Sequence, residues 1–456
     1  MATKQNDRLV AIMVLEAHLT NTSPLLIGSG SNEAADKEII LRPDKKPYIP
    51  GTALAGKLLR RFNDCQDLIP PKTKSHIQFW GGEYKYQEEN KEKIQPYQSH
   101  IIIEDACWVE GTPSKVIRDG VRINHQTNLA EDKGKFDYEL LEPGCTFAFR
   151  AEIKIRESFK KEDFQKMGQY LLELVGKDFR IGASEKAGFG KLECKDAKAY
   201  WFEFPTDEII WFDYLGGIKP TKPYSFTNTL TYTPQKTFQL TADFTLKSTL
   251  LTAAAGVDAS DPDKVQLSRK NGAKKEFILS GAAIRGALKH RALRILKVQG
   301  KSQTEADNFL NNLFGFVTEV KAAKLNAKKS RLRAEESAFS KDSSNHQTRI
   351  KIDRFTGGTI SGALLDAKPI TCSDRQTIQL VFNLPDYTPQ EVELMLYLLK
   401  DLMLSDLAIG GEKNIGRGIL VGQNATLRFD GTDTIEIAST GINTRDLARL
   451  KTYLPV

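Results

Sequence analysis

Hydrophobic and polar residues alternate strictly in one stretch of the second half of the chain. From Phe238 to Leu246 every even-numbered position is hydrophobic and every odd-numbered position is polar. A period of two residues predicts a β-strand with one buried face. The hydrophobic stretch VAIMVLEAHL, residues 10–19, predicts the corresponding strand near the beginning of the chain.

Each half of the chain also contains a late segment with helical spacing. Residues 161–176 place hydrophobic side chains three or four positions apart, which is typical of an amphipathic helix. In the second half, Thr388, Pro389 and Glu391 form a helix-capping pattern with proline at the first helical position. A second helix is therefore expected to begin at Pro389.

Several motifs occur twice, at a nearly constant separation. GTALAGKLLRR (51–61) and GAAIRGALKHR (281–291) share the pattern G-x-A-[LI]-x-G-x-L-x-x-R. Three further pairs follow in the same order, namely FWG and LFG, IEDA and AEES, and INHQTN and IDRFTG. A fifth pair comes after these. It has the pattern G-x5-G-x-G, with glycines at Gly182, Gly188 and Gly190 in the first half, and at Gly410, Gly416 and Gly418 in the second. The chain is therefore predicted to be a tandem duplication of a whole domain.

The order of predicted elements in each half is strand, helix, strands, helix, strand, which is ferredoxin-like. The predicted fold is α+β, with two tandem ferredoxin-like (RRM-like) domains that carry inserted hairpins and loops. Prolines and glycines concentrate between residues 205 and 236, which is typical of a linker. We place the first domain at residues 1–225 and the second at residues 226–456.

Composition excludes some classes of protein and leaves a polyanion partner open. The 456 residues carry a formal net charge of +7, so binding to a polyanion is permitted but not required. The five cysteines and six histidines form no metal-binding spacing, so a zinc site is not expected and the thiols are expected to be reduced. No signal peptide or long apolar segment is present, and we expect a cytoplasmic protein without a membrane partner.

The stretch from Gly51 to Lys57 reads G-x-x-x-x-G-K, as in a phosphate-binding P-loop. However, Leu58 stands where a P-loop needs Ser or Thr, and Pro50 precedes the motif in place of a buried strand. The second copy has Ala287 in place of the lysine. The motif therefore predicts the start of a tightly packed helix that faces a polyanion, and not an NTPase.

The doubled set of motifs resembles a known family. PYIPGTALAGKLLRR, FWGG…IIIEDA, IDRFTGG and the G-x5-G-x-G loop are similar to those of backbone subunits of CRISPR type III effectors, in the RAMP superfamily. Two such units in one chain resemble the fused subunits of the type III-D branch. The resemblance implies three kinds of partner: a CRISPR guide RNA, a single-stranded target RNA, and other subunits of the effector.

The resemblance also implies a cleaving aspartate in the loop before the first helix, about fifteen residues before its glycine. Asp36 matches this spacing, and Asp263 is the corresponding candidate in the second half, with Asp258 and Asp261 as open alternatives. A carboxylate can accept the proton of an RNA 2′-OH or hold a divalent ion that lowers its pKa. The expected cofactor is therefore a divalent metal ion, with Mg²⁺ as the expected identity and no metal ligands assigned.

Guide-RNA contacts are implied on the paired helices, on the glycine loops and on one hairpin. The predicted RNA-binding residues are Lys57, Arg60, Arg61, Gly182, Lys186, Gly188, Gly190, Arg285, Lys289, Arg291, Arg354, Gly410, Lys413, Gly416, Arg417 and Gly418. Glycine lets backbone N–H groups approach a phosphate closely. An ordinary basic helix face and a tight helix-to-strand turn are the alternative explanations.

Thumb-like hairpins, which in the family displace single bases, are predicted at Val121 to Tyr138 and at Ile352 to Asp366. The first thumb departs from the family pattern, because Asn124 and His125 replace Asp353 and Arg354. The basic stretch from Lys321 to Arg333 contains no acid. It is expected either to touch target RNA or a neighbouring subunit, or to be a solvated strand edge.

The leading hypothesis is an RNA-guided endoribonuclease subunit, metal-dependent, that cleaves target RNA through its loop aspartates. The alternative is a non-catalytic, structural subunit that only binds guide RNA. A stand-alone guide-processing nuclease ranks last, because no convincing pair of histidines is present.

Overall fold

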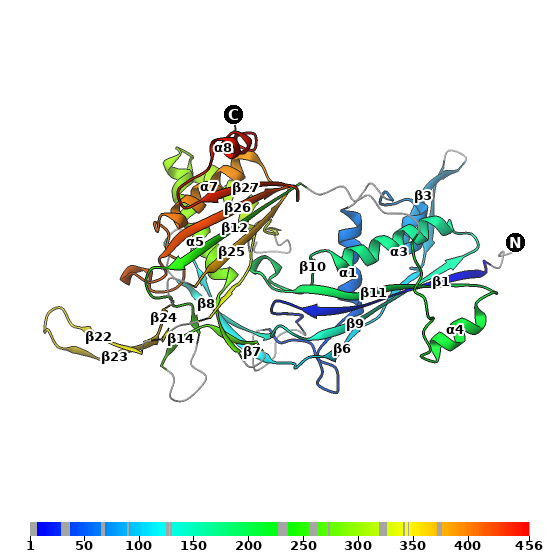
Figure 1. The fold of residues 1–456 in the computed structure, drawn as a ribbon, viewed down its shortest axis with the longest axis horizontal. Helices are drawn as coiled ribbons and strands as arrows, with labels where there is room; N and C mark the ends of the chain where they lie inside the picture. The colour runs from blue at the N-terminus through cyan, green and yellow to red at the C-terminus, as the bar shows by residue number, and fades with distance from the viewer. Residues whose placement is uncertain are drawn as a thin grey trace.

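The computed structural model describes residues 7–28, 37–64, 69–88, 91–124, 127, 130–226, 236–254, 262–271, 274–318, 326–340, 343–344, 346–371 and 376–455. Within these residues the chain forms two α+β domains side by side, with the first domain on the right of Figure 1 and the second on the left.

The first domain is built on one antiparallel sheet of long and short strands. The strand order is β10-β11-β1-β9-β6-β2, and β5 pairs with β9. The order of the main strands (fourth, first, third, second) is that of a ferredoxin-like sheet. Its elements are β1 (Leu9–Asn21), β2 (Tyr48–Ile49), α1 (Gly51–Asn63), β5 (Ile101–Ile103), β6 (Ala106–Glu110), β9 (Thr146–Arg156), α3 (Lys161–Gly176), β10 (Phe179–Arg180) and β11 (Lys191–Glu203).

The second domain repeats this arrangement and adds a strand at one edge. The strand order is β19-β25-β12-β26-β27, in which β27 is the addition. Its elements are β12 (Thr237–Leu246), α5 (Gly281–Val298), α6 (Gln303–Phe314), β19 (Arg333–Ala334), β25 (Ile378–Pro385), α7 (Pro389–Met403), β26 (Leu420–Phe429), β27 (Asp433–Ala438) and α8 (Thr444–Lys451).

The insertions form short elements around these two sheets. In the first domain they are α2 (Lys74–Trp80), β3 (Gly82–Glu88), β4 (Lys91–Tyr97), β7 (Lys115–Ile123), β8 (Ala130–Leu141), the 3-10 turn η1 (Glu185–Ala187) and α4 (Glu208–Leu215). In the second they are β13 (Ala253–Ala254), β14 (Lys264–Gln266), β15 (Ser268–Asn271), β16 (Lys274–Leu279), β17 (Phe316–Thr318), β18 (Asn326–Lys328), β20 (Ser337–Phe339), β21 (Ser343–Ser344), β22 (Gln347–Ile352), β23 (Thr359–Lys368), β24 (Ile370–Thr371) and η2 (Lys413–Ile415).

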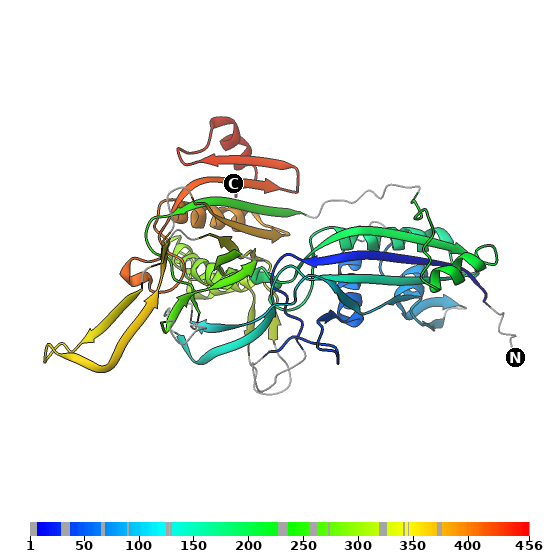
Figure 2. The ribbon, with the colours of Figure 1, turned by 60° about the horizontal axis from the view of Figure 1, so that its bottom comes forward.

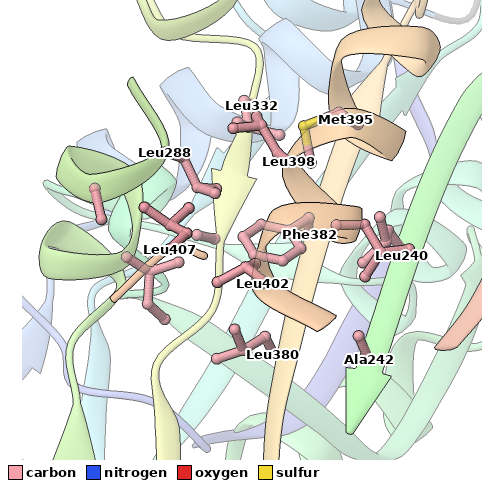
Figure 3. Packing of buried hydrophobic residues seen from close by; sticks show 14 of the residues in the cluster. Leu240, Ala242, Leu288, Leu332, Leu380, Phe382, Met395, Leu398, Leu402 and Leu407 are labelled. Atoms are coloured by element: carbon pink, nitrogen blue, oxygen red, sulfur yellow. The ribbon is translucent and has the colours of Figure 1, made fainter. Parts of the chain in front are cut away.

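Helices cover one face of each sheet, and the core lies between them. The even-numbered residues of β12 are buried, as their alternation predicts, and contact the side chains of α5 and α7. Figure 3 shows Leu240, Phe382, Leu398 and Leu402 meeting in this core. The odd-numbered residues of β12 are polar and lie on the open face of the sheet.

The open face of the first sheet is partly covered by a helix. Helix α4 places Tyr214 against Tyr200 and Phe202, in a small buried cluster with Ile12 and Val14. These residues are the ones that alternate with the main core residues along β1 and β11. The open face of the first sheet is therefore not entirely free.

Both predicted thumbs are present, but their predicted limits are wrong. The first hairpin, β7–β8, begins at Lys115 rather than at Val121, and the second, β22–β23, begins at Gln347 rather than at Ile352. The β22–β23 hairpin projects away from the body, whereas β7–β8 runs along the second domain (Figures 1 and 2).

The ferredoxin-like fold in two copies is confirmed, as are the alternating strand, the helix at 161–176 and the capped helix that begins at Pro389. The boundary between residues 225 and 226 stays a prediction, although each main sheet takes all its strands from one side of it. None of the helices that the structure describes is both long and apolar enough to cross a membrane.

The packing in Figure 3 leads to a stability prediction. Phe382 is 2% exposed in the second core, so Phe382→Ala should lower the free energy of unfolding of that domain by about 3–5 kcal/mol. Phe355 is 100% exposed on the second thumb, and Phe355→Ala is the control, with an expected change within about 0.5 kcal/mol. Urea unfolding followed by circular dichroism measures both, and equal losses would contradict the assignment of the core.

Candidate nucleic-acid interface

A cleft of about 1320 Å³ lies between the two domains and is rich in cations. Eleven Lys and Arg residues line it, against six Asp and Glu residues. The cations are Lys57, Arg60, Arg61, Arg180, Lys186, Lys191, Arg269, Lys329, Arg331, Arg333 and Arg428. The cleft therefore has a clear excess of positive charge contributed by both domains.

Helix α1 supplies the first wall of the cleft. Arg60 is exposed, whereas the Nζ of Lys57 donates to both carboxylate oxygens of Glu185, at 2.8 Å each. Burial lowers the pKa of Lys57, an effect that Glu185 partly opposes. Arg61 instead connects α1 to α3, because its guanidinium donates to the carbonyl oxygens of Leu174 and Lys177 at the end of α3.

The loop after α3 brings Lys186 into the cleft. Its Nζ donates to the carbonyl oxygen of Arg331 in the second domain, at 3.3 Å. Burial, together with the neighbouring Arg333 and Lys329, lowers the pKa of Lys186 to about 8. The charged form of Lys186 is therefore disfavoured by the neighbouring cations, and an anionic ligand would stabilise it.

The second domain supplies the facing wall from its open sheet face and from the segment before β19. Gln239, Asn383 and Arg428 come from neighbouring strands, while Lys329 and Arg331 precede β19. Arg331 and Lys329 belong to the basic stretch noted in the sequence, for which no site was assigned. Arg428 was missed, because its isolated position in a strand gives no signal in the sequence.

Helix α5, the counterpart of α1, uses its cations inside the second domain. Arg285 donates to the carbonyl oxygen of Phe314 at 3.1 Å and to Ser330 Oγ at 2.9 Å, and burial lowers its pKa to about 10. Arg291 donates to Asp401 on α7 at 2.6 Å, and burial lowers the pKa of Lys289. These three residues do not line the cleft, so their RNA contact stays a prediction without support from this geometry.

The glycine loops have a structural explanation in both copies. The N–H of Gly190 donates to Pro24 O at 2.8 Å, and that of Gly418 donates to Thr249 O at 2.7 Å. A Cβ on Gly190 or Gly418 would lie about 2 Å from the carbonyl oxygen of Ile181 or Ile409. The turn itself therefore requires these glycines, as Gly182 and Gly410 are required by positive φ angles of 93° and 100°. An RNA contact for Gly182, Gly188, Gly190, Gly410, Gly416 and Gly418 stays a prediction.

Cations near the second thumb are only partly available to a ligand. Arg354 is exposed at the tip of the hairpin. Arg417 is 2% exposed and donates to Gln347 at the thumb base, at 2.7 Å. Burial lowers the pKa of Lys413, which lies in η2. Arg354 is therefore the residue predicted to bind RNA that the second thumb itself carries in an exposed position.

The two candidate catalytic loops attach to the thumbs in the same way. Asp263 is exposed and directly precedes β14, whose Lys264 pairs with Ala367 of the thumb strand β23. In the first domain, the backbone carbonyl oxygen of Lys37 accepts a hydrogen bond at 2.8 Å from the N–H of Glu139 on the thumb strand β8. Asp36, Asp258, Asp261 and His125 lie outside the described residues. The position of Asp263 at a thumb base is compatible with a role in cleavage, and the role itself stays a prediction.

The described residues do not form a metal site by themselves. No group of three or more His, Cys, Asp or Glu side chains suited to a metal ion occurs within the part of the chain that the structure describes. Asp263 offers a single carboxylate. A divalent ion there would need oxygen atoms of the RNA as further ligands.

A buried ion-pair network fixes the first thumb to the second domain. Arg118 on β7 pairs with Glu142 at 3.2 Å and with Glu336 at 2.8 Å, and all three side chains are less than 5% exposed. Burial raises the pKa of Glu336, an effect that Arg118 opposes. The orientation of the two domains therefore depends on a charge that is neutralised across their interface.

The fold and the cleft define a protein of two ferredoxin-like domains with a basic groove between them. Comparison with protein families agrees, since the model of the RAMP superfamily matches residues 18–193 and 243–421. These two regions cover most of the chain, and the protein belongs to the RAMP superfamily, whose members are RNA-binding subunits of CRISPR effectors. No individual curated protein matches the sequence.

The network around Arg118 leads to a second stability prediction. Arg118→Met leaves Glu142 and Glu336 buried without their cation, so the free energy of unfolding should fall by about 3–5 kcal/mol. Arg122→Met on the same strand is the control, because that side chain is 69% exposed and pairs with Glu131 at only 3.7 Å. Chemical denaturation measures both variants, and an equal, small effect would show that the network contributes little.

Proposed function

We propose that the protein is a backbone subunit of a CRISPR type III effector, similar to the fused subunits of the type III-D branch. It binds guide RNA along the cleft between its domains, contributes to the groove for the guide–target duplex, and cleaves target RNA through loop aspartates. The observation that carries the proposal is the cleft itself, with eleven cations against six acids on two RNA-binding-type domains.

The character of the cleft suits a phosphate backbone better than a base. Its eleven cations are all arginines and lysines and come from both domains, and such side chains neutralise successive phosphates without reading sequence. Polar groups of the open sheet face, such as Gln239 and Asn383, can hydrogen-bond to riboses. Sequence choice is then left to base pairing between guide and target.

For cleavage we propose that Asp263 acts on an RNA strand held at the base of the second thumb. Its carboxylate would accept the proton of the 2′-OH, whose oxygen attacks the adjacent phosphorus. The bond from phosphorus to the 5′-oxygen breaks, and water protonates the departing oxygen, which leaves a 2′,3′-cyclic phosphate and a 5′-hydroxyl. Asp36 is proposed to act in the same way in the first domain. The expected dependence on Mg²⁺ is part of the proposal.

Cleavage is tested with the assembled complex, its guide and a labelled complementary target. Asp263→Ala and Asp36→Ala should each abolish one specific cut, with a loss of at least about a hundredfold in its rate, because a positioned general base contributes that much. Asp263→Asn keeps the shape and should be equally inactive. Asp243→Ala, a half-buried aspartate on β12, is the control and should leave every cut intact.

If both cuts persist in the Asp36 and Asp263 variants while guide RNA stays bound, the structural alternative replaces the catalytic one. Chelation of divalent ions in the wild-type complex tests the metal in the same assay.

The lowered pKa of Lys186 gives a pH prediction for RNA binding. The free amine loses its proton near pH 8, and a bound phosphate favours the charged form. Affinity for single-stranded RNA should therefore fall by about tenfold between pH 7 and pH 9, as proton linkage requires. Lys186→Arg keeps its charge over this range and should remove that fall, which a filter-binding titration at fixed salt can measure. Identical pH profiles for the two proteins would place Lys186 outside the RNA site.

A further inference from the structure

The two domains are joined by the insertion of one loop into a surface of the other domain. The first loop, residues 182–190, places the turn η1 against the start of α5 and the segment after β19. A Cβ on Gly281 would lie 2.3 Å from Ala187 O, and a Cβ on Gly188 would lie 2.7 Å from Glu336 N. No side chain fits at either glycine. The contact is therefore a close approach of two backbones.

The second loop, residues 410–418, has the same conformation, but within the described part of the chain it contacts only its own domain. Ile409 N–H donates to Gly418 O at 2.9 Å, as Ile181 N–H donates to Gly190 O at 2.9 Å in the first loop. Gly416 corresponds to Gly188, yet a Cβ there would meet nothing within 4 Å among the described residues. Ile415, the counterpart of Ala187, is 51% exposed.

The receiving surface is also present twice, and the described residues fill only one of the two copies. In the second domain it consists of Gly281 and the segment Ala334–Glu336, which the first loop fills. In the first domain the same positions are Gly51 and Ile103–Asp105, where Glu104 and Asp105 are exposed. The interface joins a glycine loop of one domain to a receiving surface of the other. It therefore leaves the receiving surface of the first domain and the glycine loop of the second domain for contacts with other molecules.

We infer that the second loop is a docking element for another polypeptide. Its partner is a ferredoxin-like domain that offers the start of its first helix and its second strand, as α5 and β19 do for the first loop. The inference deepens the proposed function and rests on it in one respect, namely that the protein works within a complex of several subunits. It does not depend on RNA cleavage.

Charge argues that this partner is not a second copy of the same chain. Within the chain, Arg180, just before the first loop, pairs with Glu335 at 2.7 Å, and Arg333 pairs with Asp178 at 2.8 Å. A junction between two copies would set Ala408 in the place of Arg180 and Ile102 in the place of Arg333. Both ion pairs would be lost, and such pairs select the correct partner at an interface.

The carboxylates at the two positions also differ in their present partners. Glu104 pairs with Arg150 of its own domain, whereas its counterpart Glu335 binds both Arg333 of its own domain and Arg180 of the other. The second loop and the receiving surface of the first domain therefore lack the charge complementarity that the internal junction has. We expect each of them to bind a different polypeptide and not a second copy of this chain.

The partner can be mapped with a photo-crosslinking amino acid in place of Ile415. The variant is incorporated into the complex with guide RNA and the other effector subunits, then irradiated, and the crosslinked peptides are sequenced by mass spectrometry. The expected crosslink joins residue 415 to the start of the first helix, or to the second strand, of a ferredoxin-like domain in a different chain. Crosslinks to Gly51 or Ile103–Asp105 of a second copy, or to another kind of surface, would overturn the inference.

A charge substitution tests the energetics. Ile415→Glu should weaken association of the chain with its neighbouring subunit by about tenfold or more, as expected for a buried apolar contact at an interface. Val298→Glu is the matched control, because this aliphatic side chain is 89% exposed at the end of α5, and it should assemble normally.

RNA binding separates this inference from the proposed function. Residue 415 does not line the cleft, so the isolated Ile415→Glu chain should bind single-stranded RNA like the wild type. Normal RNA binding with normal assembly would refute the docking role alone. Absence of RNA binding in the wild-type chain would instead refute the proposed cleft.

Discussion

The backbone contact between the first loop and the second domain is the constraint on which the rest of the molecule depends. Gly188 and Gly281 allow two main chains to meet where a single methyl group would collide. This approach sets the orientation of the two sheets. The cleft exists because α1 and the open face of the second sheet are held apart at one fixed spacing, with Lys186 reaching across to Arg331. The buried pairing of Arg118 with Glu336 holds the first thumb in the same frame.

Duplication has produced equivalent positions with different functions. Lys57 and Arg60 on α1 line the cleft, whereas Arg285 and Arg291 on α5 bind partners within their own domain. The cause is the single internal junction, since the cations of α1 line the cleft between the domains, whereas those of α5 do not. A motif match between the halves therefore predicts a shared local structure, and it does not predict a shared ligand.

Local patterns in the sequence were sufficient for the fold. Alternation along β12 and the capping residues Thr388 and Glu391 act over a few positions, so their consequences can be predicted without tertiary contacts. The site depends on contacts between distant segments. Arg180, Arg333 and Arg428 come together only when the domains meet, and no spacing in the chain indicates it. The same reason explains why the thumbs were predicted too short, because strand pairing continues beyond the motif as long as a partner strand is present.

The carboxylates in the cleft determine how it can discriminate between ligands. Glu185 holds Lys57 and lies 3.7 Å from Lys329, while Glu335 binds both Arg180 and Arg333. An incoming phosphate must compete with these carboxylates, so an isolated anion gains little from binding. A polyanion gains from many contacts at once and releases several counterions. The acids thus select for an extended backbone over a single phosphate, and they keep the cations ordered before that backbone arrives.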